Sequence, residues 1–139
     1  MSEAHSYGKG VGGFDRTFGL PMRRFLPTLL HLARLSPGQR ALDVATGTGI
    51  AAEAALDAVG LSGHVTAVDD TPPMLDRARA RLSGRPNVSL TVERADSLSL
   101  RAASFDAVLC SMALLLGKGD VCLPAGCPAS FERLEVGIE

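Results

Sequence analysis

A short apolar strand that runs into a glycine-containing turn and then into a helix is the feature that most restricts the fold of this chain. Residues 41–45 read Ala-Leu-Asp-Val-Ala, residues 46–49 read Thr-Gly-Thr-Gly, and residues 50–59 are alanine-rich and end before a glycine. Glycines let the backbone of such a turn approach a ligand closely and leave amides free at the N-terminus of the following helix. The pattern predicts a strand–turn–helix unit with a ligand site at its turn.

The alternation of strands and helices continues along the chain. Residues 64–68 are predicted as a second strand, residues 72–82 as a helix, and residues 87–93 and 105–110 as a third and a fourth strand. Such an alternation produces a parallel sheet. We therefore predict the α/β class, with a Rossmann-like parallel sheet and helices on both of its faces. Ligands bind such sheets outside the carboxyl ends of the strands, near the point where the strand order reverses, which is here the turn after the first strand.

Four regions are expected along the 139 residues. Residues 1–13 are polar and glycine-rich and are expected to form a flexible arm. Residues 14–36 are predicted to form a helical lid of two short helices, because each of the two prolines there suits a first helical position and not an interior one. Residues 37–116 form the predicted α/β core. Residues 117–139 show no clear period and are interpreted as an atypical tail.

Composition and charge exclude several classes of protein. Hydrophobic residues make up 46% and charged residues 21%, as in ordinary globular domains. The net charge of −1 lacks the basic excess of a nucleic-acid-binding protein, so no nucleic-acid partner is expected. Basic residues outnumber acidic ones in residues 1–40. Solvated helix faces explain this more simply than a basic lid that meets an acidic substrate or a membrane surface.

The cysteines and the distribution of apolar residues bear on location and metal binding. No apolar run approaches the roughly 18 residues of a membrane-spanning helix, and the first residues do not resemble a signal peptide. Three cysteines without a secretory signal indicate reduced thiols and a cytoplasmic location. Cys122 and Cys127 could be half of a metal site, but neither a second pair nor a nearby histidine completes it, and no metal is expected.

Three aspartates at corresponding strand ends make the ligand prediction more specific. Asp43 lies in the first predicted strand, Asp69 ends the second, and Asp96 follows the third. One such aspartate would be read as a cap or a turn former, but three are expected to project toward one edge of the sheet. An acid after the second strand can accept both hydroxyls of a ribose. An acid after the third strand can accept a hydrogen bond from an adenine amino group. An acid at the end of the first strand suits an ammonium group. Together these groups describe S-adenosylmethionine (SAM).

A nicotinamide dinucleotide is the main alternative ligand. Residues 47–52 read Gly-Thr-Gly-Ile-Ala-Ala and fit the fingerprint G-x-G-x-x-G/A, and Asp69 follows at about the 20-residue spacing that this fingerprint requires. Against it, Asp43 would place a negative charge near the pyrophosphate, and Asp96 has no role in the fingerprint. An NAD(P)-binding Rossmann domain therefore remains the less favoured interpretation.

At these residues the chain resembles a known family. Residues 41–49 resemble the first motif of class I SAM-dependent methyltransferases, in a form close to that of ubiquinone/menaquinone-biosynthesis C-methyltransferases. Residues 68–75 resemble the second motif, and residues 95–97 with 104–108 resemble the third and fourth. The resemblance runs from about residue 14 to about residue 116.

The resemblance implies a set of cofactor-binding positions around the turn. Gly47 and Gly49, with the backbone of Ala45, would line the methionine moiety, and Asp69 would hold the ribose hydroxyls. Asp43 suits the ammonium. The expected cofactor-binding residues are Asp43, Ala45, Gly47, Gly49, Asp69, Asp96 and Ser97.

Further positions follow from the same resemblance. Asp96 would accept from the adenine amino group, and the Ser97 amide would lie near a ring nitrogen. Residues 14–16, Phe-Asp-Arg, resemble an N-terminal Tyr-Asp segment of the family that folds over the cofactor. Ser111 and Met112 fall where the substrate and the donor methyl group would meet. No catalytic residue is predicted.

The sequence departs from the family pattern in several places. Ala45 replaces the first glycine of the fullest first motif, and Asp70 stands where an apolar residue usually packs on adenine. No Asn/Asp-Pro-Pro-Tyr segment follows the fourth strand, which argues against methylation of amides or adenine amino groups. Residues 117–139 contain nothing like the Arg-x-Leu-x-Pro-Gly-Gly segment expected before a fifth strand. We therefore expect a fold truncated after the fourth strand.

The sequence thus predicts a SAM-dependent methyltransferase that acts on a small-molecule acceptor, with S-adenosylhomocysteine as product, or the cofactor-binding half of one. SAM is already activated, so the protein mainly supplies alignment and exclusion of water. An inactive truncated SAM-binding or interaction protein is the alternative. The apolar residues 105–116 would be left at a sheet edge, and such an edge invites pairing with a second copy of the chain.

Overall fold

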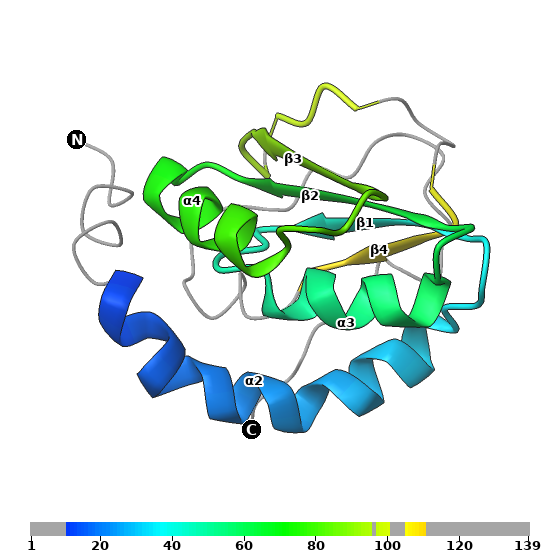
Figure 1. Cartoon of the computed structure of the whole chain (residues 1–139), viewed down its shortest axis with the longest axis horizontal. Coiled ribbons are helices and arrows are strands. Elements are labelled where there is room, and N and C mark those ends of the chain that lie inside the picture. The colour runs from blue at the N-terminus through cyan, green and yellow to red at the C-terminus, as the bar shows by residue number, and fades with distance from the viewer. Residues whose placement is uncertain (1–10, 96, 101–104, 111–139) are drawn as a thin grey trace.

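A computed structural model describes residues 11–95, 97–100 and 105–110. Figure 1 shows a parallel sheet with helices packed beside it. The elements of the described part are α2 (Val11–Ala33), β1 (Arg40–Val44), α3 (Ile50–Val59), β2 (His64–Asp69), α4 (Pro72–Arg81), β3 (Val88–Val92) and β4 (Ala107–Leu109).

The four strands lie in the order β3-β2-β1-β4, and all neighbouring pairs are parallel. Within β1, Ala41 is in register with Val65 of β2 on one side and with Ala107 of β4 on the other. Strands β1, β2 and β3 follow one another across the sheet. The chain then crosses to the opposite side of β1, where it forms β4. The strand order therefore reverses beside β1, as the sequence predicts, and the α/β class with a parallel sheet is confirmed.

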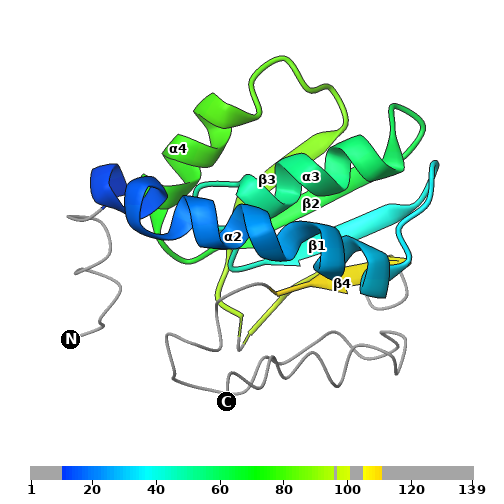
Figure 2. The same ribbon diagram turned by 90° about the horizontal axis from the view of Figure 1, so that it is seen from below.

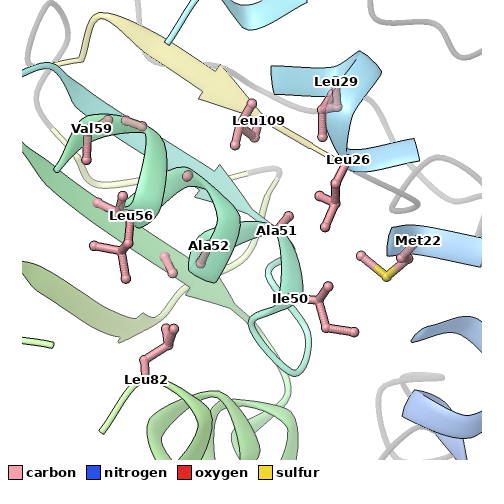
Figure 3. Packing of buried hydrophobic residues seen from close by; sticks show 14 residues of the cluster. Met22, Leu26, Leu29, Ile50, Ala51, Ala52, Leu56, Val59, Leu82 and Leu109 are labelled. Carbon is pink, nitrogen blue, oxygen red and sulfur yellow. The ribbon is translucent and has the colours of Figure 1, made fainter. Parts of the chain in front are cut away.

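The three described helices lie against one face of the sheet (Figure 2). Met22, Leu26 and Leu29 from α2 join Ile50 from α3 and Leu109 from β4 in one buried cluster. Figure 3 shows these side chains directed into the space between the helices and the sheet. Complete burial of a large aliphatic side chain contributes roughly 1.5–3 kcal/mol, so this layer supplies much of the driving force for folding.

The opposite face of the sheet is covered differently. Helices were expected on both faces, but in the part of the chain that the structure describes no helix packs on this one. Its buried residues are instead joined by partly buried side chains that follow β3 and flank β4. The buried residues are Leu42, Val44, Val68 and Val108, and the flanking ones are Ala95, Leu98, Leu100, Phe105 and Cys110.

The N-terminal helix corrects one prediction. Two short helices were expected, each beginning at a proline, but α2 runs unbroken from Val11 to Ala33 with Pro21 and Pro27 inside it. An interior proline costs roughly 3 kcal/mol. Met22, Leu26 and Leu29 bury one stripe of the helix against α3 and β4, and this packing offsets the cost. Figure 1 shows α2 as an arc rather than a straight rod, in keeping with the curvature that interior prolines produce.

The remaining boundaries differ from the predictions by a few residues. The third strand is Val88–Val92 and the fourth Ala107–Leu109, so each is shorter than predicted. The expected arm of residues 1–13 overlaps α2 by three residues, and its first ten residues lie outside the described part, as does the tail 117–139. None of the helices in the described ranges is long and apolar enough to cross a membrane.

Candidate cofactor site

The turn between β1 and α3 has an unusual backbone. Ala45, Gly47 and Gly49 have φ angles of 56°, 58° and 86°, so every second residue of the turn is left-handed. Left-handed residues that alternate with ordinary ones turn backbone N–H groups into concavities that bind anionic groups. Gly49 also caps α3, whose first amides point toward the same end of the sheet. The turn is therefore suited to a carboxylate or a phosphate.

Gly49 also allows α4 to pack directly against the turn. A Cβ atom placed on Gly49 would lie 3.1 Å from the Cβ of Ala78 and 3.3 Å from its Cα. A side chain at position 49 would therefore combine an unfavourable φ with crowding against a helix backbone. The close contact brings the residues that follow Ala78 in α4 within reach of the turn.

Asp69 joins the end of β2 to this turn. Its Oδ2 accepts a hydrogen bond from the Gly47 amide at 2.8 Å, and its Oδ1 accepts one from the Thr71 amide at 2.9 Å. Burial raises the pKa of Asp69, while these two backbone bonds lower it. A carboxylate has about four acceptor positions, so each oxygen of Asp69 can accept one more hydrogen bond. The residue is thus held in place and still able to bind hydroxyl groups.

Asp43 lies within β1 and is completely buried. Its Oδ2 accepts a hydrogen bond from the Thr46 hydroxyl at 2.7 Å, whereas no donor in the described part of the chain reaches Oδ1. Burial raises the pKa of Asp43 to about 7; the charge of Asp69 adds to the increase, and the Thr46 hydroxyl and the nearby Ala52 amide oppose it. A buried acceptor without a donor is unusual in a folded protein, and here it lies beside a candidate ligand site.

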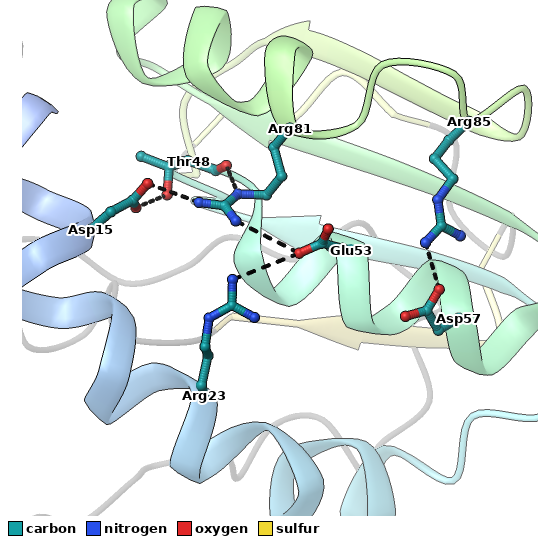
Figure 4. A network of polar contacts seen from close by, with 7 residues as sticks. All are labelled: Asp15, Arg23, Thr48, Glu53, Asp57, Arg81 and Arg85. Atoms are coloured by element: carbon teal, nitrogen blue, oxygen red, sulfur yellow. Dashed lines mark hydrogen bonds and ion pairs between the residues drawn. The ribbon is translucent and has the colours of Figure 1, made fainter.

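A network of polar contacts surrounds Thr48, between the two glycines (Figure 4). The Thr48 hydroxyl donates to Asp15 Oδ1 in α2, and Arg81 Nη2 donates to Asp15 Oδ2 at 2.8 Å. Arg81 Nε donates to the Thr48 carbonyl at 2.9 Å. Glu53 of α3 lies 3.7 Å from Arg81 Nη1 and 4.0 Å from Arg23 Nη2. The turn is therefore tied to α2 and α4 by charged side chains.

From the sequence, Asp15 is expected in the segment over the cofactor, whereas Thr48, Arg81 and Glu53 are not expected among the side chains of the site. No local sequence pattern marks Arg81, whose position follows from how α4 packs on the turn. Arg81 lies three residues after Ala78, and residues three apart share one face of a helix. The close contact of Ala78 with Gly49 therefore brings Arg81 beside the turn as well.

The structure brings five of the expected residues to one end of the sheet. Asp43, Ala45, Gly47 and Gly49 belong to β1 and its turn, and Asp69 bonds to Gly47. The chain after β3 also reaches this edge, because the Glu93 amide donates to the Asp69 carbonyl at 3.1 Å. Ser97 follows in a turn where its amide donates to the Arg94 carbonyl at 3.2 Å.

Five other expected positions lie outside the described residues: Asp96, Ser111, Met112, Cys122 and Cys127. Within the ranges that the structure describes, no group of three or more His, Cys, Asp or Glu side chains is placed to hold a metal ion.

Comparison with known proteins identifies the family. A family model for a methyltransferase domain matches residues 41–121, more than half of the chain. The chain belongs to the methyltransferase domain family. The match begins with β1 and includes the turn, β2, β3 and β4. The predicted resemblance to SAM-dependent methyltransferases is therefore confirmed.

Individual relatives are similar to this chain over part of its length. Aklanonic acid methyltransferase DauC of Streptomyces sp. (strain C5) is 33% identical over 100 residues, which cover 70% of this chain and 44% of that protein. Ubiquinone/menaquinone biosynthesis C-methyltransferase UbiE of Rhizobium etli is 40% identical over 79 residues, which cover 53% of this chain and 30% of that protein. The chain spans less than half the length of these curated relatives.

A solved structure shows the same arrangement of strands and helices. The crystal structure of a SAM-dependent methyltransferase from Aquifex aeolicus superposes with a TM-score of 0.56 at 25% identity. The superposition covers 61% of this chain and 46% of that one. Over the superposed residues, this chain therefore has the fold of a SAM-dependent methyltransferase.

Proposed function

We propose that the turn between β1 and α3 binds SAM, and that the protein to which this chain belongs transfers the SAM methyl group to a small-molecule acceptor. One observation carries the proposal. The completely buried Asp43 Oδ1 has no donor in the described part of the chain and lies beside a turn with three left-handed residues. The ammonium of an amino-acid end group would supply the missing donor to Asp43 Oδ1, and its carboxylate would suit the backbone amides at the turn and at the start of α3.

The chemistry of the site fits the parts of SAM. Asp43 would hold the ammonium. The amides of Gly47 and Gly49 already donate to Asp69 and to the Thr46 carbonyl, so the carboxylate would bind other amides at the turn and at the N-terminus of α3. Asp69 would hold the ribose hydroxyls through its remaining acceptor positions. Asp96 and Ser97 remain proposed contacts for adenine, on the resemblance alone. Asp43 would place a negative charge near a pyrophosphate, which argues against a nicotinamide dinucleotide.

Bound SAM would supply a methyl group already activated on a sulfonium. The residues of this chain bind and orient that group and keep water from it, and no catalytic base is assigned to them. Cys110, which follows β4, is not proposed as a nucleophile. Burial and the nearby Asp43 raise the pKa of its thiol to about 12, so the unreactive protonated form prevails.

The same proposal includes the kind of methyl acceptor and the location of the protein. A small-molecule acceptor is supported by the names of two relatives, which refer to aklanonic acid and to ubiquinone and menaquinone. A cytoplasmic location is supported by the free thiol of Cys110.

A chain that binds SAM without transferring its methyl group is the second candidate function, because the matched regions span less than half of the length of the relatives.

Calorimetric titration tests the proposal. SAM and S-adenosylhomocysteine should each bind one site, and NAD should release no heat. The Asp69→Ala variant should bind S-adenosylhomocysteine more weakly, whereas Asp76→Ala, which alters an exposed aspartate of α4, should bind it as the wild type does. Binding of NAD without binding of S-adenosylhomocysteine would overturn the proposal. Methyl transfer to acceptors in the same preparation separates an enzyme from a protein that only binds SAM.

A further inference from the structure

Asp15, Thr48 and Arg81 form a closed ring of hydrogen bonds, here called the Asp15–Thr48–Arg81 ring. The Thr48 hydroxyl donates to Asp15 Oδ1, Arg81 Nη2 donates to Asp15 Oδ2, and Arg81 Nε donates to the Thr48 carbonyl. The three residues come from α2, from the turn and from α4 (Figure 4). One ring therefore connects three segments that are distant in the sequence.

The ring adds a second restraint on a peptide group of the turn. Thr48 lies between Gly47 and Gly49, and glycine restricts the backbone less than any other residue. The Gly47 amide is held by Asp69, and the Gly49 amide donates to the Thr46 carbonyl at 3.0 Å. Arg81 holds the carbonyl of Thr48, which belongs to the same peptide group as the Gly49 amide. That peptide is therefore held at both ends, by the Thr46 carbonyl at its amide and by Arg81 at its carbonyl.

The charges at the ring suit this positioning role. The side chain of Arg81 is 20% exposed and that of Asp15 is 35% exposed, so water screens their contact only in part. Arg81 also lies 3.7 Å from Glu53, so two carboxylates share its charge. Its Nε and Nη2 donors are directed at Thr48 and Asp15. The guanidinium is thus engaged by the protein and is not available to bind a ligand through those donors.

We propose that Arg81 is a positioning residue, which couples the docking of α2 to the conformation of the glycine turn. This inference rests on the proposed function, because the turn is the proposed SAM site. It implies that α2 acts on the turn through the contacts of Asp15 with Arg81 and Thr48. When Asp15 is held by Arg81, the turn is held in its binding conformation; when the contact is lost, both the turn and the start of α2 are released.

A second ion pair supplies a matched control. Arg85 Nη2 lies 2.6 Å from Asp57 Oδ1, which joins the segment after α4 to α3. This pair has the same chemistry as the Arg81–Asp15 pair, but in the described part of the chain it forms no hydrogen bond with Thr48 or with either glycine of the turn. Replacement of Arg85 by Met therefore removes an arginine–aspartate pair between neighbouring segments and leaves the ring in place.

The test compares Arg81→Met, Asp15→Asn and the control Arg85→Met in the full chain. Calorimetry measures the dissociation constant for S-adenosylhomocysteine, and thermal melting confirms that each variant is folded. Loss of a charge-assisted hydrogen bond should weaken binding about tenfold in Arg81→Met, and Arg85→Met should bind as the wild type does. The double variant Asp15→Asn/Arg81→Met should bind no more weakly than Arg81→Met, because both changes break the same ring.

Hydrogen exchange in the absence of ligand provides a readout that does not depend on the cofactor. The amides of Gly47 and Gly49 should exchange faster in Arg81→Met than in Arg85→Met. If the wild type fails to bind S-adenosylhomocysteine, the proposed function fails, and faster exchange would still support the ring as the holder of the turn. If Arg81→Met and Arg85→Met are alike in both exchange and affinity while the wild type binds, the inference is overturned and the proposed function stands.

Discussion

The carboxylate of Asp69 accepts a hydrogen bond from the Gly47 amide at 2.8 Å, so the acid at the end of β2 also holds the turn that follows β1. The same carboxylate accepts from Thr71, which fixes its orientation as α4 begins. One side chain therefore links two βα units and presents its remaining acceptor positions to the proposed ribose site.

Replacement of Asp69 by alanine should weaken S-adenosylhomocysteine binding most among single changes at the site. It removes a charged acceptor of two hydroxyl hydrogen bonds, each worth roughly 1.5–3 kcal/mol, and it also frees the Gly47 amide. Asp69→Asn keeps one acceptor oxygen, so its affinity for S-adenosylhomocysteine should lie between those of Asp69→Ala and the wild type. Calorimetry on folded variants measures the effect, and an unchanged dissociation constant in Asp69→Ala would contradict the assignment of this residue.

The buried Asp43 should make stability depend on pH. Its pKa is about 7 in the folded chain and near 3.8 when unfolded, so the folded chain binds more protons between these values. Its contribution to stability is therefore full below about pH 3.8 and is lost as the pH rises toward 7. Asp43→Asn stays neutral and keeps an acceptor for Thr46.

Urea unfolding of the ligand-free wild type and of Asp43→Asn at a series of pH values isolates this effect. The free energy of unfolding of the wild type, minus that of the variant, should fall by a few kcal/mol between about pH 4 and pH 8. A difference that stays constant or rises over this range would show that Asp43 is ionised in the folded chain at low pH.

Two substitutions in the turn should differ clearly in their effect on stability. Gly49→Ala places a side chain at a φ of 86° and 3.1 Å from Ala78, so it should lower the free energy of unfolding by about 2 kcal/mol or more. Ala45→Gly relieves a left-handed alanine with a φ of 56°, a gain that the greater freedom of unfolded glycine largely cancels. Chemical denaturation measures both. Equal destabilisation by the two changes would contradict the described backbone of the turn.

Strand β4 should promote self-association. It pairs with β1 along one edge, and no described strand pairs with its other edge. An apolar strand with free backbone groups is a template for pairing with a second chain. Analytical ultracentrifugation at tens of micromolar should therefore detect dimers or larger species. A thermally stable monomer at that concentration would show that the chain covers this edge itself.

Much of the fold and of the site follows from local sequence. The strand around Asp43 and the glycines after it specify the first βα unit, and Asp43 and Asp69 lie at the sheet edge where we propose the ligand site. These features depend on short spacings, which local geometry translates directly into position.

The unbroken α2 and the role of Arg81 could not be read from local patterns. Local preference ends a helix before Pro21 or Pro27, and only the burial of Met22, Leu26 and Leu29 against other elements reverses that preference. Arg81 gains its role from Asp15, which lies 66 residues earlier in the chain. Contacts of this kind exist only once the helices are packed.

A titration followed by two-dimensional amide NMR tests the central claim most directly, because it shows both whether SAM's product binds and where. The labelled full chain is titrated with S-adenosylhomocysteine and, separately, with NAD. The largest shifts under S-adenosylhomocysteine should fall on the amides of Ala45, Gly47 and Gly49 and of residues next to Asp69, and NAD should leave them unchanged. Shifts confined to other parts of the chain, or shifts of these amides with NAD alone, would contradict the assignment of this turn as a SAM site.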